Sequence, residues 1–184
     1  MSLNTWQETL VATSIDSTAI TAAAETSCIH PTGLITIPPN WWYIGRMMKV
    51  TAHGRISCAV TTPGTARFKV KHAAIAVFDS GALNLNIVAK TSVPFWFECV
   101  LCCRTIGITT AATLFGFGQF ASEAVIASPV PAVGGNGSLI CPVGTPAAGV
   151  GFDSTIANIM DFTFTQTVAT GSQQTHIYKV EALN

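Results

Sequence analysis

The sequence contains little charge. Only 10% of its 184 residues are Asp, Glu, Lys or Arg, whereas roughly 25% is usual for a soluble domain. The formal net charge is zero, which argues against the basic footprint of a nucleic-acid-binding protein. Charge normally keeps proteins soluble and separate. Its scarcity in a chain that is 49% hydrophobic therefore predicts a surface that meets other protein.

Long apolar runs are also missing. No stretch of the sequence is long and clean enough to cross a bilayer, so we expect no membrane association. Residues 1–6 carry no basic segment followed by an apolar run, and we therefore expect no secretory signal. A length of 184 residues fits one domain, which we place at residues 1–184.

Sequence patterns of enzymes are absent as well. The chain has no G-x-S-x-G, no P-loop and no dinucleotide fingerprint. Its four histidines lack metal-ligand spacing. Among the carboxylates, Asp153 and Asp161 lie fairly near each other in sequence, and Asp153 is expected to cap a turn. We predict no catalytic residues, no cofactor, no metal site and no enzymatic activity.

The cysteines are few for this length and lie within apolar runs. This usage predicts reduced, buried thiols and synthesis in a reducing cytoplasm. Cys99 and Cys102 form a C-x-x-C, but in a strand they would point to opposite faces and could not share a metal. The six cysteines are Cys28, Cys58, Cys99, Cys102, Cys103 and Cys141.

What the sequence does contain is alternation with a period of two. Residues 48–60 place mostly apolar side chains at even positions and mostly polar ones at odd positions, as a half-buried strand does. A Pro63-Gly64 turn signal follows, and residues 66–71 alternate again, which predicts a β-hairpin. The pattern recurs in residues 160–168 and 175–183, and residues 94–104 are predicted to be buried on both faces. With weak helical signals, the chain is predicted to be an all-β, antiparallel β-sandwich of jelly-roll type.

Two segments are candidate contact arms. Residues 128–151 are rich in Gly and Pro and carry no charge. A loop of this length is either functional or poorly ordered, and both alternatives stay open: an arm against a neighbouring surface, or a flexible surface loop. The N-terminal segment, residues 1–13, is the second candidate arm and also holds a weaker strand signal.

Two groups of side chains are candidate partner contacts. In the predicted hairpin, basic residues share the polar face and would dock on an acidic surface, or they would form an ordinary solvated face. Trp41 and Trp42 suit a core or a protein interface better than a carbohydrate platform. The basic candidates are Lys49, Arg55, Arg67, Lys69 and Lys71.

The segment Ile37–Ser57, with its IPPNWW and HGRIS stretches, and the following TTPGT at residues 61–65 resemble a pattern of virion structural proteins of tailed bacteriophages. Residues 153–155 and 172–178 resemble the later part of those proteins. The resemblance implies a β-sandwich protein of the phage particle. We expect a head decoration, or cement, protein on the capsid surface, made in the host cytoplasm. Its expected partners are the major capsid protein and copies of itself, as a homotrimer. The alternative is a tail or head-fibre module that binds receptor carbohydrate.

Overall fold

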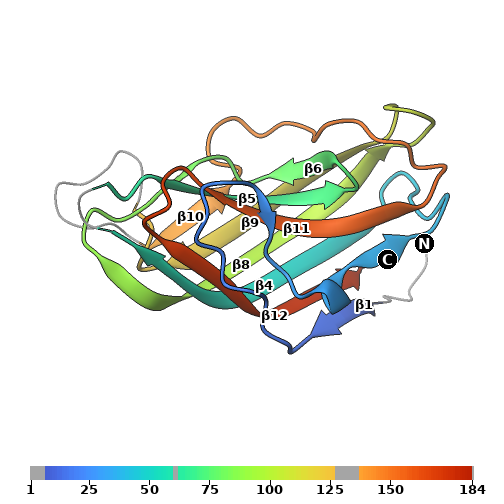
Figure 1. Cartoon of the computed structure of the whole chain (residues 1–184). Helices are drawn as coiled ribbons and strands as arrows, with labels where there is room; N and C mark the ends of the chain where they lie inside the picture. The colour runs from blue at the N-terminus through green and yellow to red at the C-terminus, as the bar shows by residue number, and fades with distance from the viewer. Residues whose placement is uncertain (1–6, 60–61, 127–136, 184) are drawn as a thin grey trace.

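The computed structural model describes residues 7–59, 62–126 and 137–183, and in these ranges nearly all regular structure is β-strand (Figure 1). One short 3-10 turn, η1 (Pro31–Gly33), is the exception within the described residues. The strands form two antiparallel sheets that pack face to face, as the sequence predicts.

Sheet A has the strand order β1-β12-β4-β8-β9-β10. Its strands are β1 (Glu8–Thr13), β12 (Ser172–Ala182), β4 (Met47–Cys58), β8 (Lys90–Thr105), β9 (Thr113–Ser122) and β10 (Ser138–Cys141). Sheet B has the order β2-β11-β5-β6, with β3 also paired to β11 and β7 to β5. Its strands are β2 (Thr26–Ser27), β3 (Ile35–Ile37), β11 (Asn158–Gln166), β5 (Thr65–His72), β6 (Ile75–Asp79) and β7 (Leu83–Asn84).

The connections make this sandwich a jelly roll. The chain passes from β1 in sheet A to β2 and β3 in sheet B, returns to β4 in sheet A, and crosses again to β5. It crosses three more times: between β7 and β8, between β10 and β11, and between β11 and β12. Two interlocked Greek keys give this wrapping, and β9 and β10 widen sheet A beyond the eight-strand pattern. The predicted jelly-roll sandwich is confirmed.

The predicted hairpin around Pro63-Gly64 is wrong. β4 pairs with β8 and β12 in sheet A, whereas β5 pairs with β11 and β6 in sheet B. The connection therefore crosses from one sheet to the other. Alternation shows that each strand has one face toward the core, but it does not show which strand is the partner.

Aromatic rings fill the space between the sheets. Phe68 of β5 is fully buried, and its ring centroid lies 5.1–5.7 Å from those of five other phenylalanines. Burial of each such side chain contributes about 1.5–3 kcal/mol, so this cluster ties both sheets together. The five neighbours are Phe95, Phe97, Phe120, Phe162 and Phe164.

The outer face of sheet A has no covering layer among the described residues. On β8 the odd positions from Phe95 to Cys103 are buried, as predicted, but the even positions are partly or well exposed. Trp96 is 36% exposed. The prediction that this strand is buried on both faces is therefore wrong, because apolar side chains here face outward.

Each predicted arm contains a strand in its described part. In the segment 128–151, residues 128–136 lie outside the described residues, but β10 pairs with β9. The chain then runs along the edge of sheet B, where the Val143 amide donates to Ser80 O at 2.7 Å and the Val150 amide to Ala76 O at 3.1 Å. It closes one side of the sandwich. Of residues 1–13, 1–6 lie outside the described residues, and β1 pairs with β12.

Candidate functional site

The five basic candidates do not form one patch. Lys49 and Arg55 lie on β4 in sheet A, whereas Arg67, Lys69 and Lys71 lie on β5 in sheet B. The predicted shared polar face of these basic residues depended on the hairpin and is wrong. The crossover between the two strands places these groups on separate faces.

Nearby carboxylates neutralise most of this positive charge. Lys49 Nζ lies 2.8 Å from Glu98 Oε2, and Arg67 donates two hydrogen bonds to Asp79. Glu25 accepts hydrogen bonds from Lys69 and Lys71, and these bonds lower the pKa of its carboxyl. Lys90 pairs with Glu123 and Lys179 with Glu181, so all five lysines of the chain lie in ion pairs.

The tryptophan pair does not form an open platform. Trp42 is only 3% exposed, and its ring packs near His72 and Phe152, with centroids 5.7 and 6.4 Å away. Trp41 is partly buried, and the Arg46 guanidinium lies 3.6 Å over its ring. Trp42 is thus a core residue, and the exposed face of Trp41 is covered by a cation–π contact.

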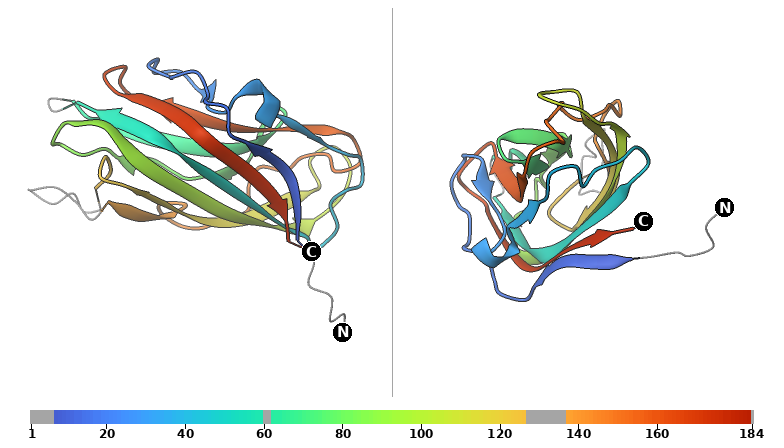
Figure 2. Two further views of the ribbon diagram at one scale, coloured as in Figure 1. Left: turned by 90° about the horizontal axis from the view of Figure 1, so that it is seen from below. Right: turned by 90° about the vertical axis from the view of Figure 1, so that its right-hand side faces the viewer.

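One end of the sandwich is strongly apolar. Three loops meet there: residues 38–46 before β4, residues 106–112 between β8 and β9, and residues 152–157 before β11. We call this surface the loop end, and the right-hand view of Figure 2 faces it. Its large side chains are 46–66% exposed: Tyr43, Ile44, Ile106, Ile108 and Ile156. Their exposure is notable because single exposed hydrophobics are common, whereas groups of them mark contact surfaces.

Hydrogen bonds hold these loops together. The Gly45 amide donates to Cys103 O at 2.9 Å, and the Ser154 amide donates to Gly107 O at 3.0 Å. Asp153 accepts from the amides of Thr109 and Thr155, both at 2.8 Å. Hydrogen bonds from Thr155 and Thr109 lower the pKa of the Asp153 carboxyl. Asp153 therefore caps its turn, as the sequence predicts, and the loop end is pre-ordered.

A second exposed feature lies on the outer face of sheet A. The register places His53 of β4, Trp96 of β8 and Ala121 of β9 side by side, all with side chains facing outward. Trp96 lines two shallow hollows, of about 280 Å³ and 500 Å³. The smaller is also lined by Phe117, which is 48% exposed. Sequence reasoning missed Trp96, because it placed this whole strand in the core.

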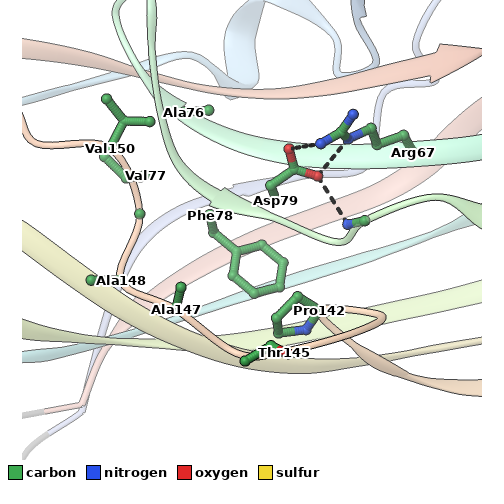
Figure 3. A pocket seen from close by; sticks show the side chains of 12 residues that line it. Arg67, Ala76, Val77, Phe78, Asp79, Pro142, Thr145, Ala147, Ala148 and Val150 are labelled. Carbon is green, nitrogen blue, oxygen red and sulfur yellow. Dashed lines mark hydrogen bonds and ion pairs between the residues drawn. The ribbon is translucent and has the colours of Figure 1, made fainter.

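A third hollow, of about 290 Å³, lies between β6 and residues 142–150 (Figure 3). Phe78 and Pro142 form its apolar wall, and the Arg67–Asp79 ion pair lies near it. Its lining contains no His or Cys, and its one carboxylate is held by Arg67.

The thiols and carboxylates do not gather into a reactive centre. In the part of the chain that the structure describes, no three His, Cys, Asp or Glu are grouped to hold a metal ion. All six cysteines are free. Cys99 is buried and Cys102 faces outward, on opposite sides of β8 as predicted. Burial raises the pKa of Cys103 to about 11 and of Cys141 to about 12, which keeps these thiols protonated. The described residues include no helix suited to crossing a membrane.

No protein-family model matches this chain, and no curated protein matches it. A similar solved structure is the CBM2 module of the evolved Dit of Lactobacillus casei BL23 phage J-1. The two are 13% identical, with a TM-score of 0.34, over 82% of this chain and 68% of the other. A similarity this low assigns nothing to this chain, and the fold rests on the strand order described above.

Proposed function

We propose that this protein is a non-enzymatic structural protein of a bacteriophage particle that binds the head shell as a decoration protein. The loop end is the observation that carries the proposal. It presents five large apolar side chains on hydrogen-bonded loops, in a chain whose lysines are all ion-paired. The jelly roll and the resemblance of residues 37–65 to phage virion proteins support the same role.

The binding mechanism in this proposal is apolar burial. Covering each half-exposed isoleucine contributes roughly 1 kcal/mol, about half the value for a fully exposed side chain. Pre-ordered loops lose little conformational entropy on docking, so more of this energy appears as affinity. Copies assembled as a homotrimer would bridge neighbouring capsid subunits, and binding to the assembled shell alone stabilises that shell. The loop end replaces the basic residues as the principal contact.

Labelling of particles tests the proposal. An antibody raised against this chain, coupled to gold, is imaged by electron microscopy on particles purified from the source of the sequence. Label distributed over the head is the expected result. Label confined to the tail would contradict the decoration role, and unlabelled particles that also lack the chain by mass spectrometry would contradict any virion role.

A further inference from the structure

Trp96 lines both hollows on the outer face of sheet A. Its neighbour on β9 is the small residue Ala121, and Trp96 is 36% exposed. On the other side of β8 lies His53. The larger hollow is bounded by Trp96, His53, Pro94 and Ala121, together with residues 122–123. The exposed part of the Trp96 indole is therefore accessible to a ligand that lies on the outer face of sheet A.

The lining of the smaller hollow is polar as well as aromatic, and its one charged side chain, Glu98, is ion-paired. The next outward-facing row holds Glu98 and Gln119, which pair across β8 and β9. The charge of Glu98 is balanced by Lys49 at 2.8 Å. Gln119 donates to Ser138 Oγ at 2.7 Å, and its carbonyl oxygen is a further possible acceptor. Beside the larger hollow, Arg55 lies opposite Pro94 and donates a hydrogen bond to Gln174 Oε1 at 2.6 Å. The smaller hollow therefore offers hydrogen-bonding groups beside the rings without an unpaired charge in its lining.

A second aromatic ring extends the surface. Phe117 pairs with the Val100 position of β8, four residues beyond Trp96. At about 3.3 Å per residue, the two rings are about 13 Å apart along the strand. The smaller hollow lies between them, lined by both rings and by Glu98 and Gln119. This length suits a short chain of rings better than a single small molecule.

We propose that this surface, made of Trp96, Phe117, His53, Glu98 and Gln119, binds a neutral oligosaccharide. A pyranose ring has an apolar C–H face, which packs on an aromatic side chain, and a hydroxyl edge, which needs nearby hydrogen-bonding groups. Trp96 and Phe117 supply the aromatic surface for the C–H face, and the polar side chains between them supply hydrogen-bonding groups for the hydroxyl edge. A protein partner fits this surface less well, because the hollows are shallow and their polar groups are spread among the rings.

The site is separate from the loop end. Trp96 lies nine positions before Thr105, where β8 ends and the loop of residues 106–112 follows, and this separation corresponds to about 30 Å along an extended strand. A particle-bound copy that docks through its loop end would leave Trp96 free. Carbohydrate binding can therefore be measured on the isolated protein, independently of whether the decoration role is correct.

Binding of the whole chain to an array of neutral and acidic oligosaccharides tests this inference, followed by titration of each hit by ligand-observed NMR. We expect one or more neutral oligosaccharides to bind. Trp96→Ala should weaken that binding by at least about tenfold, as truncation of a central aromatic contact does, and Trp96→Phe should retain most of it. Ile159→Ala is the matched control, because Ile159 is 52% exposed on the outer face of the other sheet and lines neither hollow.

Three results would overturn the inference. They are no binding of any neutral oligosaccharide at millimolar concentration, binding restricted to acidic ones, and binding that Trp96→Ala leaves unchanged in a variant that melts like the native protein. If Trp96→Ala removes particle attachment while the native protein binds no sugar, the surface is a protein contact. That outcome also overturns the inference and leaves the virion role intact.

Discussion

The imidazole of His72 packs edge-on against Phe152, with ring centroids 4.7 Å apart and ring planes at 81°. The side chain is fully buried, and neither ring nitrogen has a hydrogen-bond partner. Because burial disfavours the charged imidazolium, the pKa of His72 is lowered from 6.5 to about 4. The folded protein therefore holds this histidine neutral.

Acid should destabilise the protein through His72. Between pH 6.5 and pH 4 the unfolded chain binds a proton at His72 that the folded protein does not, so stability falls as the pH falls. The pKa difference corresponds to about 3 kcal/mol in the free energy of unfolding. His72→Leu should remove this component, and urea unfolding of both proteins from pH 4 to pH 7.5 measures it. Equal pH dependence in the two proteins would show that another group is responsible.

The ion pairs of Glu25 should stabilise the folded protein modestly. Glu25→Gln leaves Lys69 and Lys71 without a partner, and we expect a loss of about 1 kcal/mol at pH 7. The folded-state pKa of Glu25 is lowered, so this stability exists above the unfolded pKa and disappears as the pH falls through the folded value. Thermal unfolding at pH 7 and in acid measures the difference. Glu123→Gln is the control, because the Glu123 side chain is 69% exposed; equal losses in the two variants would contradict the prediction.

Cys102 should be the one thiol that reacts readily in the folded protein. It is partly exposed on the outer face of sheet A, whereas the other five cysteines are buried. Titration with DTNB should give about one fast thiol in native protein and all six in denaturant, because reaction requires an accessible thiolate. Cys102→Ser should remove the fast phase. Several fast thiols in the native protein would contradict the packing of β8.

The loop end should carry the particle contact. Ile44→Asp combined with Ile108→Asp places two charges where apolar contact is proposed, and we expect capsid occupancy to fall at least about tenfold, because buried unpaired charges are costly. Both side chains are 66% exposed, so the melting temperature should change little. Ile159→Asp, at an exposed position on β11, should leave occupancy unchanged. Co-sedimentation with particles measures all three proteins, and equal occupancy would rule out the loop end as the contact.

Strand positions and the inward faces could be read from the sequence. The alternation over 48–58 corresponds to β4, with Met48, Val50 and Ile56 buried. The pairing of strands could not be read from the sequence. β4 and β5 each alternate with a period of two whether they form a hairpin or lie in opposite sheets. The exposure of Trp96 could not be predicted for a similar reason. A strand with apolar side chains on the outer face of an uncovered sheet has the same sequence pattern as a strand that is buried on both faces.

The candidate contacts were less predictable for a related reason. The positions of the basic residues in the sequence did not show that Glu25, Asp79 and Glu98, which lie on other strands and loops, would pair with them. The loop end likewise combines three loops separated by tens of residues. Single isoleucines in such loops carry no periodic signal, and only the fold brings them together.

A cryo-electron microscopy reconstruction of the intact particle, at a resolution that separates the two sheets, tests the central claim most directly. The account predicts density for this jelly roll on the head shell, with Tyr43, Ile44 and Ile108 against a capsid subunit and Trp96 facing away. A particle without this chain, or one in which the loop end faces solvent, would contradict it.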